Sequence, residues 1–215
     1  MKLTDYEKAY SSKSVVNAWE NAPGKQVIVS AFLHFYDKLG QKNKVVADIG
    51  CGTGYLLNLL HKKVSVGGGI IGVDFSEVAI RHGRKFYPAI DLRCEDGTKT
   101  SIGSSTVDFL VSYGSYEHFR NHKDGIAEAA RILKNDAIFL IMVPTLGIDR
   151  TDRTDEGWYE EREIEDQPIR QMQWNLYRDT WEKIFEQQGL KLFDYDLPVR
   201  FGAKKPGVFY FGCKL

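Results

Sequence analysis

Three glycines spaced two apart, Gly50, Gly52 and Gly54, follow the apolar run 45–49 and precede a helix-like stretch. Glycine is needed where the backbone takes a positive φ angle, or where a ligand approaches the main chain without meeting a Cβ atom. Asp48 stands two residues before the first of these glycines. A carboxylate at that place repels a phosphate and attracts a cationic ammonium or sulfonium group. The spacing therefore predicts the floor of a site for a cofactor that carries positive charge.

A second carboxylate ends the next apolar run along the chain. Asp74 follows Gly54 by twenty residues and closes the segment Gly72-Val73-Asp74. An acid at this position accepts hydrogen bonds from the hydroxyls of a ribose in nucleoside-containing cofactors. A dinucleotide fingerprint would require a third glycine at position 55, where this chain has Tyr55. The combination predicts a nucleoside cofactor and disfavours a nicotinamide one.

A sheet must hold these residues, and from residue 44 onward apolar runs alternate with helix-like stretches, as in a parallel sheet wound with helices. We predict strands at 45–49, 69–73, 90–94, 107–112 and 137–143. The helices predicted among them are 55–63, 76–86 and 123–133, the second with Ser76 as its N-cap. Towards the C-terminus we predict a helix at 174–188 and an antiparallel pair of strands at 190–197 and 208–213.

Two segments lie outside this alternation. Residues 1–25 are predicted to form a helical arm, followed by an apolar helix at 26–39. Residues 145–173 are charged and aromatic and too long for a plain connection, so we interpret them as an insertion that serves as a substrate lid. The chain shows no internal repeat and no boundary of composition, so we treat 1–215 as one domain.

The segments VADIGCGTG, GVDFS, CEDG, VDFLVSYGSYEHF and RILKNDAIFLIMVP resemble the successive motifs of class I S-adenosylmethionine-dependent methyltransferases of the small-molecule type. The resemblance covers residues 26–143, and the terminal pair of strands is similar to that family's last two. It implies an α/β, Rossmann-like, doubly wound sheet of seven strands in the order 3-2-1-4-5-7-6, mostly parallel with an antiparallel last strand. It also implies S-adenosylmethionine as the cofactor, bound at the carboxyl ends of the first strands.

The same motifs imply roles for individual residues. Asp48 and the glycine loop would hold the methionine part of the cofactor, Asp74 the ribose and Phe75 the adenine. Either acid after the third strand could accept from the adenine amino group, and we choose Asp96 over its neighbour. The expected cofactor-binding residues are Asp48, Gly50, Cys51, Gly52, Gly54, Asp74, Phe75, Glu95, Asp96, Gly97, Ser112, Tyr113 and, from the arm, Tyr10.

His118 lies where many small-molecule methyltransferases carry a histidine after the fourth strand. It would act either as a general base on an acceptor hydroxyl or as a structural anchor of its loop. Glu117 beside it has no further ligands at a suggestive spacing, so we predict no metal. Aromatic residues would either line the acceptor or pack on the sheet, and the candidates for substrate binding are Tyr116, Trp158, Tyr159 and Trp174.

The composition and charge of the chain limit the classes of partner that it is expected to bind. The formal net charge of +0 provides no general attraction for nucleic acid, and no apolar stretch is long enough to span a bilayer. The first fourteen residues also lack an apolar core, so we expect a cytoplasmic protein. Its three cysteines have no CxxC spacing and are expected to be reduced. The segment Ser112-Tyr-Gly-Ser-Tyr116 differs from the Asn/Asp-Pro-Pro-Tyr/Phe loop of relatives that methylate amide or adenine nitrogens. This favours a small-molecule acceptor, with a protein or peptide acceptor, or a non-catalytic cofactor-binding partner subunit, as alternatives. The sequence specifies neither the methylated atom nor the oligomeric state.

Overall fold

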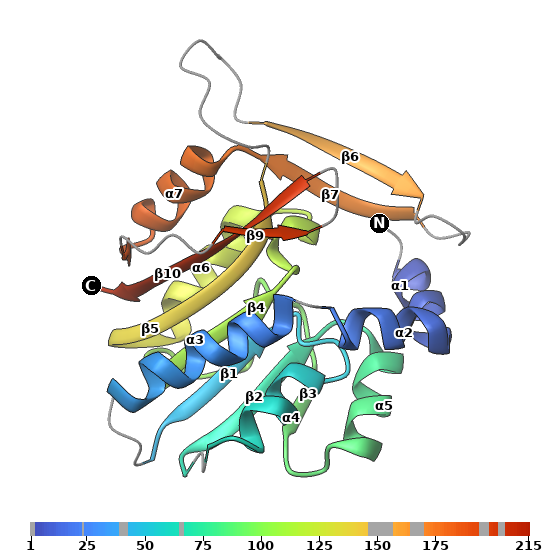
Figure 1. Cartoon of the computed structure of the whole chain (residues 1–215), viewed down its shortest axis with the longest axis horizontal. Coiled ribbons are helices and arrows are strands. Elements are labelled where there is room, and N and C mark those ends of the chain that lie inside the picture. The colour runs from blue at the N-terminus through green and yellow to red at the C-terminus, as the bar shows by residue number, and fades with distance from the viewer. Residues whose placement is uncertain are drawn as a thin grey trace.

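A twisted β-sheet lies at the centre of the molecule (Figure 1). The computed structural model describes residues 3–22, 24–38, 43–64, 67–145, 157–163, 170–193, 198–201 and 205–215. Its strands follow the order β3-β2-β1-β4-β5-β10-β8, and β9 pairs with β10 outside this path. When β8 and β10 are counted as the sixth and seventh strands, this is the order 3-2-1-4-5-7-6, so the predicted fold class is confirmed.

The strands of the sheet are β1 Val45–Ile49, β2 Gly69–Asp74, β3 Asp91–Cys94, β4 Val107–Tyr113, β5 Leu133–Pro144, β8 Leu190–Leu192, β9 Pro198–Phe201 and β10 Lys205–Lys214. The first five pair in parallel, with β1 between β2 and β4. Strand β10 runs antiparallel to both β5 and β8. The predicted antiparallel closing strand is therefore present, and the carboxyl ends of β1, β2 and β4 meet at one edge.

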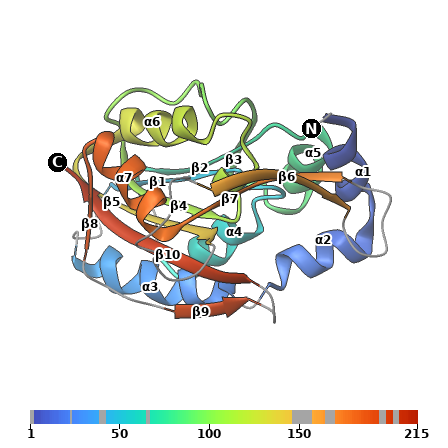
Figure 2. The ribbon, with the colours of Figure 1, turned by 90° about the horizontal axis from the view of Figure 1, so that it is seen from above.

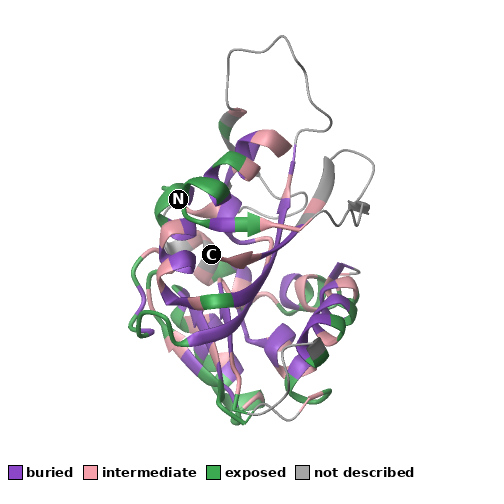
Figure 3. Cartoon of the chain, turned by 90° about the vertical axis from the view of Figure 1, so that its left-hand side faces the viewer, coloured by how far each residue is buried: buried purple, intermediate pink, exposed green. Residues whose placement is uncertain are grey.

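Helices cover both faces of the sheet, as Figure 2 shows for α3 on one side and α6 and α7 on the other. Their bounds are α3 Gly24–Lys38, α4 Tyr55–His61, α5 Glu77–Phe86, α6 His122–Ile132 and α7 Arg178–Gln187. Neighbouring strand residues point to opposite faces, because side chains alternate along a strand. Ala47 packs in the cluster of α6 and α7, whereas Val46 packs in that of α3 and α4. Figure 3 shows how the buried residues follow the strands.

Helix α5 illustrates how the local sequence sets an element. The Ser76 hydroxyl accepts a hydrogen bond from the backbone N–H of Ala79 at 3.2 Å, as predicted for an N-cap. Glu77 in the first turn and two basic residues in the last turn complement the helix dipole. The start of this helix is therefore fixed directly beside Asp74, at the end of β2.

The segment before α7 differs from its prediction. Residues 174–176 were expected in a helix, but they belong to β7 Arg170–Leu176, which pairs antiparallel with β6 Gly157–Glu163. Cross-strand pairing of Trp174 with Tyr159 outweighs the helical spacing of the aromatic residues, and α7 begins only at Arg178. The expected insertion thus contains a two-stranded hairpin, while 146–156 and 164–169 lie outside the described residues.

Two helices form the N-terminal arm, α1 Leu3–Ser11 and α2 Lys13–Glu20. Figure 1 shows both close to the carboxyl ends of the parallel strands, and α1 packs against α5. In the ranges that the structure describes, no helix is both long enough and apolar enough to cross a membrane.

Candidate functional site

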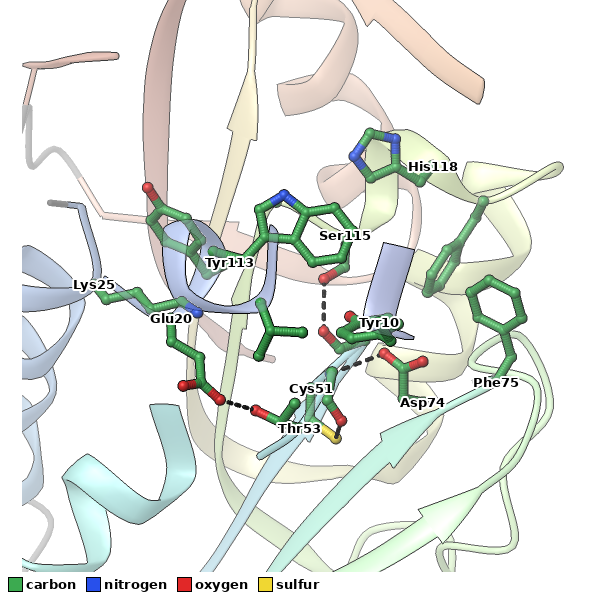
Figure 4. A pocket seen from close by; sticks show the side chains of 16 residues that line it. Tyr10, Glu20, Lys25, Cys51, Thr53, Asp74, Phe75, Tyr113, Ser115 and His118 are labelled. Atoms are coloured by element: carbon green, nitrogen blue, oxygen red, sulfur yellow. Dashed lines mark hydrogen bonds between the residues drawn. The ribbon is translucent and has the colours of Figure 1, made fainter. Parts of the chain in front are cut away.

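A cavity of about 290 Å³ lies at the carboxyl ends of β1, β2 and β4 (Figure 4). The arm contributes Tyr10, Val16, Trp19 and Glu20, and the first turn of α3 contributes Lys25. The remaining walls come from the loops after the strands, namely Gly50, Cys51, Gly52, Thr53, Asp74, Phe75, Tyr113, Gly114, Ser115, His118 and Phe119. Segments far apart in the sequence therefore meet around one space.

The glycine loop has the backbone that the sequence predicts. Gly50, Gly52 and Gly54 have φ angles of +77°, +56° and +79°, a region that residues with a Cβ rarely adopt. A Cβ at Gly52 would also lie 2.6 Å from the hydroxyl oxygen of Tyr10, and one at Gly50 would collide with Ser115. The loop therefore leaves a bare main chain facing the arm and the end of β4.

Asp74 fastens this loop to the end of β2. One carboxylate oxygen accepts a hydrogen bond from the Gly52 N–H at 2.8 Å, and the other accepts from the Ser76 N–H at 2.9 Å. Burial raises the pKa of Asp74 to about 6, although both N–H groups favour the ionised form. Each oxygen keeps a second lone pair, so the carboxylate can still accept from a ligand hydroxyl in the cavity it lines.

Asp48 lies on β1 behind the loop, and its side chain is almost completely buried. Among the described residues, its Oδ1 atom has no hydrogen-bond partner. Burial raises the pKa of Asp48 to about 8, while the charge of Lys25 opposes this increase. A buried carboxylate with an unsatisfied oxygen is unfavourable by itself, so the position suits a ligand that brings a hydrogen-bond donor or positive charge.

The arm is held over the cavity by two carboxylates. Glu20 on α2 accepts a hydrogen bond from the Thr53 hydroxyl at 2.6 Å, as Figure 4 shows. Glu7 on α1 caps the start of α5, where it accepts from the Glu77 N–H at 2.9 Å and from the Val78 N–H at 3.2 Å. A carboxylate is favoured at this place because the helix N-terminus carries free N–H groups and partial positive charge.

His118 stands at the end of the short 3-10 turn η1, Tyr116–His118, which follows β4. Its Nδ1 atom lies 2.6 Å from the carbonyl oxygen of Met172 on β7. Because a carbonyl oxygen can only accept, Nδ1 carries a proton, and Nε2 is the basic nitrogen of the neutral ring. Nε2 lies 3.6 Å from a carboxylate oxygen of Glu117. The hairpin therefore sets the tautomer of a histidine in the cavity wall.

Several predicted cofactor residues form the wall itself and others lie behind it. Those in the wall are Tyr10, Gly50, Cys51, Gly52, Asp74, Phe75 and Tyr113. Behind the wall, Asp48 and Gly54 are buried, and the Ser112 hydroxyl donates to the carbonyl oxygen of Ile49 at 2.8 Å. Gly97 lies so close to Ile49 and Phe119 that a Cβ would clash with both. These residues support the wall without forming its surface.

The two acids after β3 are occupied in their own loop. Glu95 accepts hydrogen bonds from the backbone N–H and the hydroxyl of Ser101, at 2.7 and 2.6 Å. Asp96 accepts from the backbone N–H and hydroxyl of Thr98, both at 2.8 Å. Both bonds to Asp96 go to Oδ1, and neither side chain belongs to the cavity wall, so the structure does not bring either acid to the cavity.

The residues predicted to bind the substrate lie in different places in the structure. The side chain of Tyr116 is 0% exposed and packs in the core against Phe119, so the structure does not bring it to the cavity wall. Trp174 donates from Nε1 to the carbonyl oxygen of Phe119 at 3.1 Å and thereby joins β7 to η1. Tyr159 packs edge-on against Trp174 and is 41% exposed, outside the cavity wall. The side chain of Trp158 lies outside the described residues.

The prediction from sequence missed part of the wall, namely Val16, Trp19, Glu20, Lys25, Thr53, Gly114, Ser115 and Phe119. Thr53 lies inside the glycine motif, and Gly114 and Ser115 directly follow Tyr113. Their position next to predicted site residues could therefore have identified these three as part of the wall. Glu20 and Lys25 come from helices that carry no motif. No group of three or more His, Cys, Asp or Glu side chains in the described ranges could hold a metal ion.

Comparisons with known proteins agree with this geometry. Residues 47–141 match the family described as "Methyltransferase domain". A probable S-adenosylmethionine-dependent methyltransferase of Mycolicibacterium smegmatis is 28% identical over 111 residues, which are 51% of this chain and 42% of that protein. A putative methyltransferase of invertebrate iridescent virus 6 is 27% identical over 110 residues, or 51% of this chain and 41% of that protein. The match thus spans less than half the length of these curated relatives.

Solved structures share the fold at low sequence identity. A methyltransferase from Methanosarcina mazei superimposes with a TM-score of 0.69 at 17% identity, covering 86% of this chain and 97% of the other. A putative methyltransferase from Listeria monocytogenes gives 0.66 at 12% identity, with 86% and 97% coverage. Residues 47–141 are thus similar to the methyltransferase domain family and to S-adenosylmethionine-dependent relatives, and the chain has the fold of class I methyltransferases of known structure.

Proposed function

We propose that the protein transfers a methyl group from S-adenosylmethionine to a small-molecule acceptor. The observation that carries the proposal is the unsatisfied buried oxygen of Asp48 behind a glycine loop that Asp74 holds at the cavity wall. A cationic, nucleoside-containing ligand suits all three features, because it brings an ammonium group, ribose hydroxyls and a part that must approach bare backbone.

The residues present fit this cofactor. Asp48 and the main chain of Gly50 and Gly52 would hold its methionine part, Asp74 its ribose, and Phe75 its adenine. Phe75 is 36% exposed at the wall, as expected of an aromatic ring available for stacking. When bound, the cofactor supplies an activated methyl group on a sulfonium. The protein must then align the acceptor with that methyl group and exclude competing water.

The acceptor would enter beside His118. A hydroxyl or amine acceptor has a proton to lose, and Nε2 of His118 is the basic nitrogen at the wall because Met172 fixes the proton on Nδ1. Val16, Trp19 and Phe119 add apolar surface to the same cavity. This lining favours a small acceptor with an apolar body and one polar group.

We extend the proposal to the whole sequence. Residues 1–215 act as one methyltransferase domain, in which the arm (1–25) and the insertion (145–173) cover the site. The bonds of Glu20 to Thr53 and of Met172 to His118 support this view. We also place the protein in the cytoplasm, which is consistent with its three free cysteines.

Calorimetric titration tests the donor. We expect the protein to bind S-adenosylmethionine and S-adenosylhomocysteine, not to bind NAD, and to lose binding in Asp74→Ala. Because Asp74 also holds Gly52, the variant Asp74→Asn serves as the milder comparison, and circular dichroism confirms its folding. Absence of donor binding by the wild-type protein would contradict the proposal.

Turnover tests the acceptor. A panel of small hydroxyl, amine and thiol compounds and a set of basic peptides are incubated with methyl-labelled donor. Methylation of small compounds supports the proposal, and methylation of peptides alone would assign a protein acceptor. Tight donor binding with no labelled product in either set would favour a non-catalytic partner subunit.

A further inference from the structure

Lys25 is the only lysine or arginine in the described wall of the cavity. It lies in the first turn of α3, and Figure 4 shows its side chain reaching towards Glu20 at the cavity. The adjoining residue, Gly24, donates its backbone N–H to the hydroxyl of Tyr113, which fixes the start of α3 against the end of β4. The position of the lysine is therefore set where the start of α3 meets the end of β4.

The ammonium group of Lys25 is charged but poorly satisfied. With the residues that the structure describes, it makes no hydrogen bond and no ion pair within 4.0 Å. It lies 5.7 Å from the ring centre of Tyr55 and 5.8 Å from that of Tyr113, which gives weak cation–π attraction. Burial lowers its pKa to about 8, while the charges of Asp48 and Glu20 oppose the decrease. An ammonium in this state can still donate three strong hydrogen bonds.

None of the neighbouring carboxylates forms a hydrogen bond or a close ion pair with Lys25. Glu20 accepts from the Thr53 hydroxyl, and Asp74 accepts from two backbone N–H groups. Asp48 attracts Lys25 only across a distance, since no ion pair forms between them. Lys25 thus places one positive charge in the cavity wall, and the unsatisfied oxygen of Asp48 lies buried behind the same wall. The two groups match the two ends of an α-amino acid zwitterion.

We propose that Lys25 binds the carboxylate of the methionine end of S-adenosylmethionine and makes the site specific for donors with a complete amino acid end. The inference rests on the proposed function. A charged hydrogen bond between an ammonium and a carboxylate inside a partly closed cavity is strong, because little water competes for either group. A donor without the carboxylate would leave the ammonium of Lys25 without this partner, as in the unliganded protein, and so would gain nothing from the lysine.

The competing interpretation is that Lys25 only packs α3 against Tyr55 and Tyr113. The two interpretations predict different changes in the affinity of a Lys25 variant for ligands with and without the carboxylate. Three probes separate them: S-adenosylhomocysteine, its decarboxylated analogue with the amine retained, and 5′-methylthioadenosine, which has neither group. Binding constants are measured by calorimetry for the wild-type protein, Lys25→Met and Lys25→Arg.

The matched control is Lys13→Met, which removes an exposed lysine from α2 in the N-terminal arm. We expect Lys25→Met to weaken S-adenosylhomocysteine binding by roughly 10- to 100-fold, while affinity for the two truncated probes stays within about twofold. Lys25→Arg should retain most of the preference for the carboxylate. Lys13→Met should behave like the wild type.

Three other outcomes of the binding measurements would contradict the inference, and they can be distinguished from one another. An equal loss for all three probes in Lys25→Met assigns a purely structural role, and thermal unfolding then shows the same loss of stability without ligand. Unchanged S-adenosylhomocysteine binding places the carboxylate elsewhere. If the wild-type protein binds none of the probes, the proposed function fails and the inference fails with it.

Discussion

Asp48 and Asp74 are both buried, but their carboxylates are satisfied to different degrees. Asp74 accepts from the backbone N–H groups of Gly52 and Ser76, whereas Asp48 keeps an oxygen without a partner among the described residues. Burial raises the pKa of Asp74 to about 6 and that of Asp48 to about 8. Ionisation of Asp48 therefore destabilises the folded protein more than ionisation of Asp74 does. A bound cationic ligand would stabilise the ionised form of Asp48 the most.

The pH dependence of stability follows from Asp48. Its pKa rises from 3.8 to about 8 on folding, so between those values the folded protein holds a proton that the unfolded chain has released. The free energy of unfolding therefore falls as pH rises through this window. We expect Asp48→Asn to be more stable than the wild type at pH 7.5, by about 1 kcal/mol or more, and the difference to vanish near pH 4. Urea unfolding at a series of pH values measures this.

Asp74 contributes to the same slope over a narrower range, so Asp48→Asn should reduce the pH dependence without removing it. The variant should also bind S-adenosylhomocysteine more weakly, because the amide carries no charge for an ammonium. Parallel stability profiles for the two proteins would show that Asp48 is ionised in the folded state and that this account of the residue is incorrect.

His118 allows its two possible roles to be separated by one substitution. An asparagine side chain can place its amide nitrogen near the Nδ1 position and still donate to the carbonyl oxygen of Met172. His118→Asn thus keeps the anchor and removes the base. For an acceptor that must lose a proton, we expect the rate to fall by about 10²- to 10⁴-fold with little change in donor affinity.

The comparison variant His118→Ala loses both the base and the anchor. A wild-type rate in His118→Asn together with a slow rate in His118→Ala would assign the histidine a structural role. Single-turnover kinetics with labelled donor distinguishes these cases, because product release does not enter the measurement.

At the scale of elements, the N-terminal arm is attached through polar contacts that differ in kind. Glu7 caps the first turn of α5, and Glu20 bonds to Thr53 in the glycine loop. Between these attachments, Tyr10 lies against Gly52 and packs edge-on against Trp19 at 5.0 Å. The arm therefore depends on few contacts with the rest of the chain, and it is the element expected to open first.

Glu7→Ala should release α1 with little effect on the core. Removal of a capping carboxylate costs about 0.5–2 kcal/mol, and here the cost falls on the docking of the arm because Ser76 still caps α5. We expect faster amide hydrogen exchange in α1 and α2 and unchanged exchange in the central strands. Glu77→Gln is the control, since that exposed side chain lies on the same helix turn but does not contact the arm.

If Glu7→Ala left exchange in α1 unchanged, contacts other than the cap would hold the arm. If exchange increased equally in β1 and β4, the substitution would have lowered global stability. Only a local increase supports the arm as a separately opening element.

At the scale of the molecule, the cavity draws on the arm, the start of α3, the ends of β1, β2 and β4, and the turn held by the hairpin. A ligand that fills it should therefore stabilise parts that are distant in sequence. With S-adenosylhomocysteine at one hundred times its dissociation constant, linkage predicts a gain of about 2.7 kcal/mol in stability. For a chain of 215 residues this corresponds to a rise in Tm of roughly 5–10 °C.

Differential scanning calorimetry with and without the ligand measures this rise, and NAD is the negative control. Hydrogen exchange in the same samples should show protection in α2 as well as in the glycine loop. An equal effect of NAD, or no effect of S-adenosylhomocysteine, would contradict the assignment of the cavity.

The glycine loop and the alternation of strands and helices could be predicted from the sequence because both are encoded locally, whereas the strand order followed from the resemblance to a family. Gly50, Gly52 and Asp74 stand at a spacing that few other structures require, and alternating apolar runs define the sheet. Glu20 and Lys25 were missed because their place depends on how α2 and α3 dock, which no local pattern reports. The start of α7 was misplaced because the partner of Trp174 is Tyr159, fifteen residues earlier, and pairing at that distance overrides helical spacing.

The hairpin of β6 and β7 meets the turn η1 through two carbonyl oxygens, that of Met172 bonded to His118 and that of Phe119 bonded to Trp174. Main-chain acceptors exist whatever side chain a residue carries, so most hairpin positions can change without losing this joint. The donor half of the cavity rests on β1 and β2 and does not depend on the hairpin. If the proposed function holds, acceptor choice can therefore diversify by drift or by laboratory grafting of residues 157–176, provided that His118 and Trp174 are retained.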